Sequence, residues 1–528
     1  MKTLTGTGTL VRLILRRDRI RIPVWLIGLV FFALSSASGV QGLYRSRAEL
    51  VTAARVVENN PAFIAMNGPA QALDTFGGRA AWEIGAFGLS AVALMSMFLM
   101  GRQTRSEEES GRMELVRAAV VGRHAPVTAA LTVVAGVNLL LGALVAAGFI
   151  ALDFPTGGSL VMGGTFAAVG LVFAALTAVT AQVTEHTRGV YGITGALLGV
   201  AYVVRAAGDI GNGSLSWLSP IGWAQAARPF AGERWEPLLL AVVVSALLVY
   251  VAFALGARRD VGAGLVAQRP GPPVASLGLA RPFGLALRLQ RAALIGWTVA
   301  LFLSGLAYGS VGRDIEDLVA DSPEMGDILT QTGGNLVDSF FATTTLMLAL
   351  LASGFSIQSA LRLRSEESSG RAEPLLATAI SRARWATSHL TVAMVGAAIV
   401  VAAGGLGTGI SYGISIGELG QVPRLLGASL VHLPAVWVLS GLAIALFGLS
   451  PRAAMFAWAA LGGSVVVGFF GQLFGFPDWV TELSPFTHSP QVPVADPTIG
   501  PLVVLSGLAA GLVALGLWAF GRRDVATT

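Results

Sequence analysis

The sequence predicts an all-α, polytopic membrane protein with twelve transmembrane helices arranged as two parallel six-helix repeats. Three observations predict this fold class: an apolar composition, a series of long charge-free intervals, and charged motifs that recur at a nearly constant distance. Of the 528 residues, 54% are hydrophobic and only 12% are charged, whereas a soluble domain carries about 25% charged residues. Because no soluble core is large enough for this apolar surface, most of it is expected to face lipid.

We assign twelve of the intervals that contain no charged residue to helices, and eleven of these twelve reach 18 residues or more. A helix that crosses a membrane needs about 20 mostly apolar residues. The remaining interval, 189–204, reaches that length if the helix continues past Arg205 and this side chain extends to the interface. The expected helices are 22–43, 84–101, 126–152, 160–183, 189–207 and 237–257, followed by 292–312, 339–361, 387–412, 425–447, 453–475 and 500–521.

The distribution of basic residues predicts that both chain ends lie on the cytoplasmic side (N-in, C-in). With the N-terminus inside, the segments on that side hold 26 of the 35 Lys and Arg residues, as expected for cytoplasmic loops. These loops also account for the net charge of +5. We expect them to contact anionic membrane lipid and no nucleic acid, because no basic cluster lies on a soluble domain.

The segments between the expected helices have patterns of their own. Residues 1–21 mix arginines with Leu, Val and Ile, which predicts an interfacial helix on the inner leaflet. The outer segments 209–236 and 475–499 contain Pro, Trp and a shared Leu-Ser-Pro, which predicts short helices that dip into the outer leaflet. The acidic run 314–328 predicts a solvated amphipathic helix, and 44–83 is a long outer loop of undetermined role.

A charged segment, 105–123, recurs as 364–382 at an offset of 259, with ten of 19 positions identical. We call these segments the first and second islands. Two further pairs of motifs recur in the same order. The first pair is Leu218–Pro220 with Leu483–Pro485. The second pair is Arg258–Val261 with Arg522–Val525, and we call these the terminal motifs. Such self-similarity predicts a duplicated architecture. The expected parts are a first half (1–261), a cytoplasmic linker (262–281) and a second half (282–528).

Local signals predict how the islands fold. Ser106 and Glu109 have the spacing of a capping box, which predicts one helix over 105–122. In the second island Ser368 replaces Glu109 and Pro374 replaces Leu115. Because proline suits the first turn of a helix, the second island is expected to divide into two short helices.

The composition excludes several kinds of chemistry. The chain has no cysteine, and its one lysine is Lys2, so neither a thiolate metal site nor a phosphate-binding Gly-x-x-x-x-Gly-Lys loop can form. The predicted helices hold no pair of carboxylates for a proton relay. His432 is the one titratable side chain well inside a predicted helix, and a hydrogen-bonded core histidine is the expected role for it. We therefore expect no metal, and no ATP hydrolysis by this chain.

The first island resembles the cytoplasmic element of type-two ABC transporter permeases, roughly Glu-x-x-x-Gly-x-x-Glu-x-Leu, between the second and third helices. Glu107, Gly111, Glu114 and Leu115 match this pattern. In the second island Glu366, Gly370 and Glu373 match, but Pro374 precedes Leu375 and displaces the leucine. The complete layout is similar to that of fused twelve-helix exporters of polyketide-type antibiotics.

The resemblance implies an export permease in a bacterial plasma membrane with no cofactor of its own. Two copies of a cytoplasmic ABC ATPase subunit would bind ATP and Mg, dock on the islands, and drive a hydrophobic or amphipathic small-molecule substrate through a cavity between helices of both halves. The residues expected to couple to the ATPase are Arg105, Glu107, Glu108, Gly111, Arg112 and Glu114 in the first island, and Arg364, Glu366, Glu367, Gly370, Arg371 and Glu373 in the second. The residues expected to line the pathway are Met95, Phe98, Phe340, Phe341 and Met347, with ordinary helix packing as the alternative for each.

Two other classes of protein remain as alternatives. A proton-coupled transporter of the major facilitator class also has two parallel six-helix halves. It predicts a short Gly-x-x-x-Asp-Arg-x-Gly-Arg loop after the second helix and acidic residues inside the membrane, and the sequence has neither. A membrane-embedded enzyme or scaffold is the third class, and it predicts convergent polar groups within the bilayer.

Overall fold

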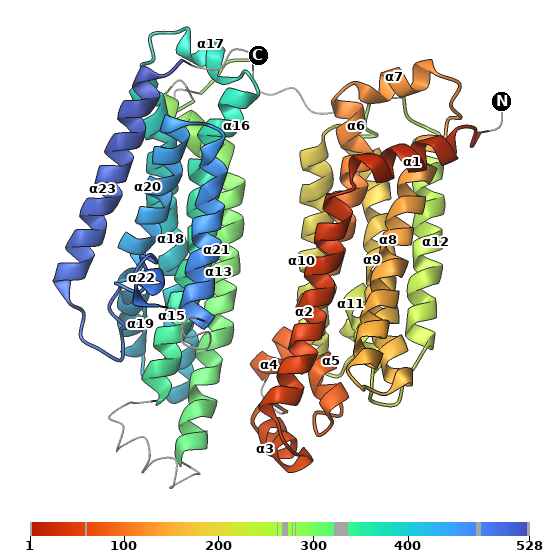
Figure 1. Cartoon of the computed structure of the whole chain (residues 1–528), viewed down its shortest axis with the longest axis horizontal. Coiled ribbons are helices and arrows are strands. Elements are labelled where there is room, and N and C mark those ends of the chain that lie inside the picture. The colour runs from red at the N-terminus through yellow and green to blue at the C-terminus, as the bar shows by residue number, and fades with distance from the viewer. Residues whose placement is uncertain are drawn as a thin grey trace. The chain divides into compact units, whose positions relative to one another are not determined.

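The computed structural model describes residues 3–58, 61–260, 262–266, 273–276, 278–279, 281–320, 336–470 and 477–524. Within these residues every regular element is a helix (Figure 1). The chain divides into two compact units, Met1–Gly271 and Pro272–Thr528, and this division falls inside the expected linker. The protein is therefore all-helical in its described parts, and each unit holds one copy of every repeated motif.

The first unit contains six long apolar helices in the predicted order. Their observed bounds differ from the predicted ones by a few residues, except that α5 begins eight residues earlier than predicted, at Phe76. The helices are α2 (Arg21–Leu43), α5 (Phe76–Gln103), α8 (Ala125–Ala151), α9 (Thr156–Val183), α10 (Thr187–Ile210) and α12 (Glu236–Gly256).

The second unit also consists of apolar helices, whose lengths differ from those of the first unit. Within the described residues of the whole chain, eleven helices are long and apolar enough to cross a membrane. Within the expected helix 453–475, the described residues form a short turn of 3-10 helix, η2 (Ala453–Met455), and α21 (Phe456–Phe470), while residues 471–475 lie outside the described part. The other helices of the unit are α13 (Pro282–Ala320), α15 (Leu336–Ala360), α18 (Arg382–Ile416), α19 (Gln421–Leu430), α20 (Leu433–Leu449) and α23 (Ile499–Arg522).

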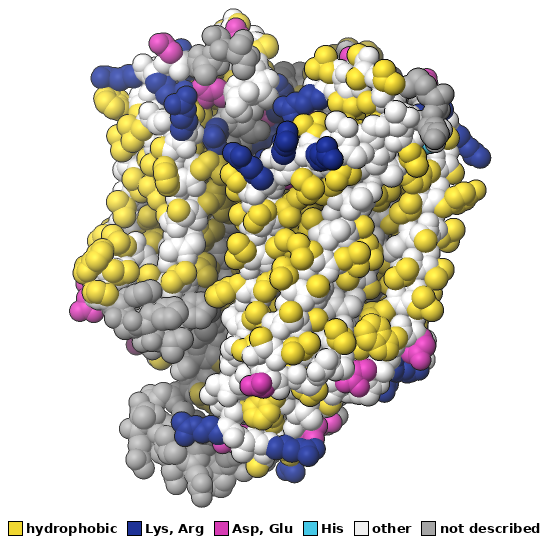
Figure 2. Space-filling view, turned by 45° about the vertical axis from the view of Figure 1, so that its right-hand side comes forward, with side chains coloured by type: hydrophobic (Ala, Val, Ile, Leu, Met, Phe, Trp, Pro, Cys, Tyr) yellow, Lys and Arg dark blue, Asp and Glu magenta, His cyan; other side chains and the backbone are white. Residues whose placement is uncertain are grey.

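The surface of these helices matches a lipid environment. Figure 2 shows hydrophobic side chains along the forward-facing helices of the first unit and basic side chains near their upper end. Ile27, Phe31 and Tyr250 are each about 70% exposed although they are apolar or aromatic. Because soluble proteins rarely expose continuous apolar surface of this extent, these faces are expected to contact lipid tails.

Small residues and one polar pair hold the first unit together. On α8 and α9, a Cβ added to Gly142 would lie 2.5 Å from the carbonyl oxygen of Gly163. The two helix backbones therefore approach as closely as small residues allow, which is the usual basis of helix association in lipid. Asn138 on α8 is fully buried and donates to the hydroxyl of Ser96 on α5 at 3.0 Å. A polar group inside the membrane is thus paired between helices.

The predicted interfacial helix forms, as α1 (Thr7–Arg17). It meets α2 at an angle and packs against α8 (Figure 1). The turn between α1 and α2 holds Asp18, which is 1% exposed and accepts hydrogen bonds from Arg102 and Gln103 at the end of α5. In the second unit the basic segment that starts at Pro282 is continuous with α13. Among the described residues, a separate interfacial helix at this place is therefore found in the first unit alone.

The long outer loop of the first unit contains two helices that sequence analysis missed, α3 (Arg47–Val57) and α4 (Pro61–Asn67). Arg205 on α10 holds α4 in place: its guanidinium donates to the carbonyl oxygens of Ile64 and Met66 at 3.3 and 3.4 Å and pairs with Asp209 at 3.3 Å. The side chain of Arg205 is completely buried. The expectation that Arg205 extends to the interface is therefore wrong, because the outer loop folds over it and supplies hydrogen-bond acceptors.

Arg205→Met is expected to destabilise the first unit by about 3 kcal/mol, because it removes one partner of a buried ion pair and leaves Asp209 uncompensated. Thermal unfolding of the purified protein, followed by fluorescence, measures this change. Arg234→Met is a suitable control, since its side chain is 52% exposed. Equal midpoints for the two variants would contradict the assignment.

The first predicted dip forms two short helices, η1 (Leu215–Leu218) and α11 (Pro220–Ala226). The hydroxyl of Ser219 accepts hydrogen bonds from the backbone N–H groups of Ile221 and Gly222 and so begins α11, which packs against α9 and α12. In the second dip, residues 471–476 lie outside the described part. The described part has one four-residue helix, α22 (Asp478–Thr481), and turns after Pro485. Of the acidic run 314–328, residues 314–320 form the end of α13, and residues 321–328 lie outside the described part of the chain.

His432 lies at the break between α19 and α20, inside the expected helix 425–447. Its side chain is buried, as expected, but neither ring nitrogen has a hydrogen-bond partner among the described residues. The expected hydrogen bond is therefore wrong. The neighbouring ring that packs near it is Phe486, at 6.5 Å between ring centres.

Candidate functional site

Both islands consist of two short helices joined by a glycine in the left-handed conformation. The first island forms α6 (Arg105–Glu109) and α7 (Arg112–Ala118), and the second forms α16 (Arg362–Ser368) and α17 (Ala372–Leu376). Gly111 has φ of 72° and Gly370 has φ of 69°. Glycine adopts this conformation without the strain that a Cβ causes, so it ends one helix and allows the next to start in a new direction.

The predicted single helix over 105–122 is therefore wrong, whereas the predicted division of the second island is confirmed. The capping-box spacing of Ser106 and Glu109 was misleading because α6 continues directly from α5 after Thr104. The carboxylate of Glu109 instead accepts from the backbone N–H of Thr187 at 3.0 Å. In both islands the break lies at the shared glycine, so Pro374 is not needed to explain it.

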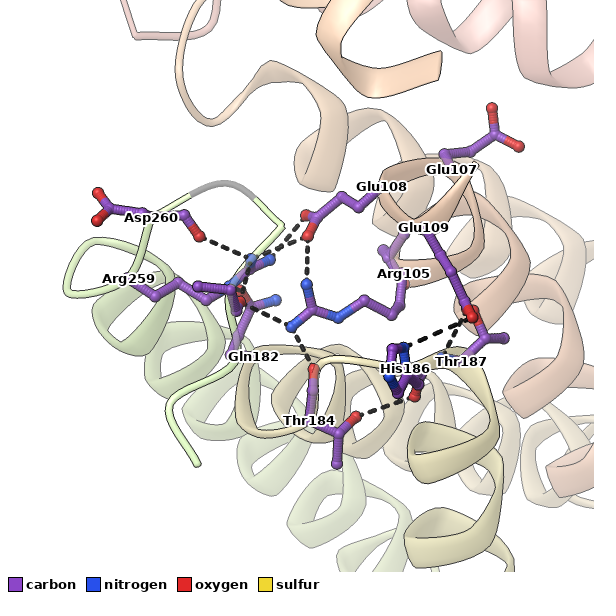
Figure 3. A network of polar contacts seen from close by, with 12 residues as sticks. Arg105, Glu107, Glu108, Glu109, Gln182, Thr184, His186, Thr187, Arg259 and Asp260 are labelled. Atoms are coloured by element: carbon purple, nitrogen blue, oxygen red, sulfur yellow. Dashed lines mark hydrogen bonds and ion pairs between the residues drawn. The ribbon is translucent and has the colours of Figure 1, made fainter. Parts of the chain in front are cut away.

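A buried ion-pair cluster joins the first island to the terminal motif of the same unit (Figure 3). The carboxylate of Glu108 accepts two hydrogen bonds from Arg259, at 2.7 and 2.9 Å, and one from Arg105 at 2.6 Å. The exposed fractions of these side chains are 6% for Glu108, 8% for Arg259 and zero for Arg105. Arg105 also donates to the carbonyl oxygens of Thr184 and Ala263. The end of α5 is thus connected to the segment that follows α12.

The second unit contains the same connection. Glu367 accepts two hydrogen bonds from Arg523, at 2.7 and 2.6 Å, and the two side chains are 4% and 16% exposed. Glu108 and Glu367 differ by the island offset of 259, and Arg259 and Arg523 differ by 264, the offset of the terminal motifs. We call these two pairs the clamps. The sequence shows both motifs, but their contact was not predicted. Their recurrence at similar offsets could have indicated that the two motifs of each half meet.

Two further contacts recur in both units. Arg123 donates to the carbonyl oxygen of Ala257 at 2.8 Å, and its counterpart Arg382 donates to that of Arg523 at 2.7 Å. Each contact links the start of the helix after the island to the end of the sixth helix, α12 or α23. Because four carbonyl oxygens at a helix end have no partner within the helix, an arginine there is stabilising. Arg123 and Arg382 are the last residues of the two islands, whereas the clamp glutamates lie near the start, so each island is held at both ends.

The glutamate directly before each clamp glutamate, Glu107 or Glu366, forms ion pairs of its own. Glu107 pairs with Arg112 at 3.6 Å and with Arg17 of α1 at 2.6 Å. The hydrogen bond from Arg17 to Glu107 raises the pKa of the arginine above its ordinary value. In the second island, Glu366 pairs with Arg371 at 2.9 Å, as Glu107 does with Arg112, and also with Arg362 at 2.6 Å.

The structure therefore divides the predicted coupling residues into two groups. Arg105, Glu108, Glu366 and Glu367 have buried side chains in ion pairs within their own unit. Glu114 and Glu373 are exposed, and Leu115 is 77% exposed beside Glu114. Arg364 is half-buried, and no ion pair of its side chain is found among the described residues. A partner protein could contact the second group directly, whereas the buried residues can act only by holding the islands in place.

The predicted pathway residues also divide. Met95 and Phe341 are fully buried in the core of their units. This position fits ordinary helix packing, the alternative role for these residues. Phe98 on α5 is 40% exposed, and its ring lies 5.3 Å from Tyr191 on α10 and 6.4 Å from Trp25 on α2. Phe340 and Met347 on α15 are half-buried, and Met347 accepts a hydrogen bond from Tyr308 of α13. These three remain predicted lining residues.

Phe98→Ala is expected to reduce transport of an aromatic substrate about tenfold without unfolding the protein, because an exposed aromatic residue packs few core neighbours but binds apolar ligands well. Uptake of a fluorescent drug into inverted vesicles measures the effect. The matched control is Leu139→Ala, an exposed apolar residue on α8. An equal loss of transport in the control would contradict a specific role for Phe98.

Comparison with known proteins gives two results. Residues 279–521 match the model of the C-terminal domain of the multidrug efflux system permease Rv1217c. Over 525 residues the chain is 42% identical to the multidrug efflux system permease protein Rv1217c of Mycobacterium tuberculosis, which covers 99% of this chain and 95% of that protein. The matched region, residues 279–521, lies entirely within the second unit. The similarity extends over both units.

Proposed function

Because the chain belongs to the family of multidrug efflux system permeases, we propose that it is the membrane-spanning subunit of an ABC exporter for hydrophobic or amphipathic compounds. ATP and Mg bind to a separate cytoplasmic ATPase, of which two copies dock on the islands. The complex works in a bacterial plasma membrane and moves its substrates outward. This chain supplies the pathway and transmits force, and it carries out no chemical step.

The observation that carries this proposal is the repeated island with its clamp. Each island offers an exposed acidic residue, Glu114 or Glu373, in the first turn of its second helix, and a buried ion pair holds the first helix in place. A surface that only needs to be soluble does not require such a base. A surface that receives force does, because a loosely held segment would move without displacing the helices behind it.

The clamps also support a specific route for the force. An ATPase dimer that closes on ATP pushes on α7 and α17. Glu108 and Arg259 transmit the displacement to the end of α12, while α6 transmits it to α5. Glu367 and Arg523 do the same for α23 and α15. The second and sixth helices of each half then move together, which opens the pathway alternately to the inner and outer side.

The substrate class follows from the helices. The exposed aromatic side chains Phe87 and Phe98 on α5 offer stacking and apolar contact. No carboxylate pair suited to binding a cation lies inside the predicted helices. Ligand sites with mainly aromatic and apolar walls favour uncharged or amphipathic molecules.

The test is co-expression with a candidate ABC ATPase, followed by purification on a tag placed on the ATPase. Co-purification, together with stimulation of ATP hydrolysis by a drug panel, is the expected result. Inverted vesicles then separate the alternatives, since ATP should drive uptake in the absence of a proton gradient. Uptake driven by a proton gradient without ATP would refute the proposal and assign the chain to secondary transport.

A further inference from the structure

The second unit contains a groove of about 240 Å³ between the start of α13 and the end of α15, where α16 begins. Its walls include the apolar side chains of Leu289, Ala293 and Phe355 and the amide of Gln358. Among the described residues that line it, the charged one is Arg362, whose side chain is 18% exposed. The groove lies at the end of the unit that carries α16 and α17, which is the expected cytoplasmic side (Figure 1).

The internal repeat allows this groove to be compared with the same place in the first unit. Residues 15–25 and 287–297 share a leucine, two arginines and a tryptophan at an offset of 272. Each tryptophan contacts the second long helix of its unit: Trp25 lies beside an aromatic ring of α5, and Trp297 donates to Gln358 of α15 at 3.0 Å. The start of α13 therefore corresponds to the turn between α1 and α2.

The first unit places a carboxylate of its own at this position. Asp18 is 1% exposed and accepts hydrogen bonds from Arg102 and Gln103. At the offset of 272 it corresponds to Gln290, and at the island offset of 259 Gln103 corresponds to Arg362. The second unit thus has a neutral amide where the first has a buried anion, beside a basic residue where the first has a neutral one.

The replacement leaves space as well as a missing charge. Gln290 is 5% exposed, its amide oxygen accepts from Ser359, and its amide nitrogen lies 3.2 Å from Nδ1 of His389. These contacts hold its side chain within the core of the unit. Smaller side chains replace larger ones at two positions of the groove, Ala293 for Arg21 and Ser359 for Met100.

Positive charge predominates around the groove. Glu366 pairs with Arg362 at 2.6 Å and with Arg371 at 2.9 Å, and Glu367 pairs with the arginine of its clamp. Three guanidinium groups therefore share two carboxylates. The part of α13 that precedes Asp314 contains arginines but no acidic residue. Because charges away from bulk water interact strongly, a further anion at this place is favourable.

We propose that this groove binds the phosphate headgroup of an anionic lipid of the inner leaflet, with Arg362 as the charged donor and Gln358 and Ser365 as neutral donors. Arginine binds phosphate oxygens through parallel N–H groups. Basic pockets between helices on the cytoplasmic side of a membrane are suited to acidic lipid headgroups. The bound phosphate takes the electrostatic role that Asp18 has in the first unit.

The dimensions of the groove favour a headgroup. Its volume of about 240 Å³ is smaller than that of a site for a whole drug-sized molecule, which begins at about 300 Å³. The acyl chains remain outside it, and Leu351, which is 41% exposed two turns before Gln358 on the same face of α15, offers them apolar contact. The inference requires neither an ATPase nor export, so it is independent of the proposed function.

The absence of cysteine from the chain makes a direct test possible, because one introduced thiol is then the only one. Ala293→Cys places it on the wall of the groove, and Ala292→Cys places a control on a neighbouring, exposed face of α13. The rate of reaction with N-ethylmaleimide is measured on the full chain in a neutral detergent. The added probes are dioctanoylphosphatidylglycerol, dioctanoylphosphatidylcholine and inorganic phosphate. The two lipids have the same acyl chains and differ in net charge.

Phosphatidylglycerol is expected to slow labelling at position 293 about tenfold and to leave labelling at position 292 unchanged. Phosphatidylcholine, which has no net negative charge, should protect much less. Equal protection by the two lipids, equal protection of the two positions, or no protection would overturn the proposal. Protection by inorganic phosphate at the same concentration would overturn the assignment to a lipid.

Arg362→Gln should raise the phosphatidylglycerol concentration needed for half-protection at least about tenfold, since a charge-assisted hydrogen bond is lost. Arg371→Gln is the matched control, because Arg371 pairs with the same Glu366 but does not line the groove. If Arg362→Gln does not fold, Ser365→Phe fills the groove from an exposed position and should remove protection. An equal effect of the two arginine substitutions, or full protection in Ser365→Phe, would contradict the site.

Discussion

Glu108→Ala is expected to abolish drug-stimulated ATP hydrolysis and to lower the free energy of unfolding by about 3–5 kcal/mol, the usual cost of removing one partner of a buried ion pair. The substitution leaves the guanidinium groups of Arg105 and Arg259 buried without their shared carboxylate. Thermal unfolding and ATPase assays of the purified complex measure the two effects. Glu109→Ala is the control, because the side chain of Glu109 is 45% exposed.

The second clamp gives an independent comparison. Glu367→Ala should destabilise the protein less than Glu108→Ala, because the side chain of Arg523 is 16% exposed, whereas those of Arg105 and Arg259 are 0% and 8% exposed. Combining Glu367→Arg with Arg523→Glu should restore part of the loss, since the exchanged charges can form the same ion pair in reverse. Stability unchanged in Glu108→Ala, or no recovery in the exchanged pair, would show that the clamps do not hold the islands.

Glu114→Lys combined with Glu373→Lys should have the opposite signature: normal stability and loss of ATPase binding. Both residues are exposed, so their replacement leaves no buried charge. A reversed charge placed against a complementary surface costs several kcal/mol of binding free energy, which corresponds to an affinity at least about a hundredfold lower. Co-purification and drug-stimulated ATP hydrolysis measure the result.

Ser368→Lys is the matched control for this pair, because Ser368 is exposed on the second island at a position where the two islands differ. It adds the same charge without removing a shared acid, so binding should persist. If the double variant still binds the ATPase and still couples hydrolysis to transport, Glu114 and Glu373 are not part of the docking surface. The clamps would then have a purely structural role.

Patterns confined to one stretch of chain were predicted well. The long helices follow from charge-free intervals, whose minimum length is determined by the thickness of the bilayer. The division of the second island also followed from local residues. The first island was predicted wrongly because the spacing of Ser106 and Glu109 was weighed above Gly111, whose left-handed conformation ends α6. The same glycine recurs as Gly370 and was the better signal.

Predictions that depended on distant partners were less successful. Arg205 was expected at the interface but is buried, because an outer loop about 140 residues away in sequence folds over it. His432 was expected to have a hydrogen bond, and none is found among the described residues. Neither outcome is visible from the residues beside these positions in the chain.

The sequence by itself determined the helical class, the repeated motifs and the location of the two islands, because hydrophobic length and internal repetition are properties of the chain alone. The tertiary structure decided which island residues can face a partner. Glu108 and Glu114 are equally acidic and six positions apart, yet only Glu108 meets Arg259, which lies 151 residues further along the chain. Burial of a charge depends on what folds against it, and that is decided by long-range packing.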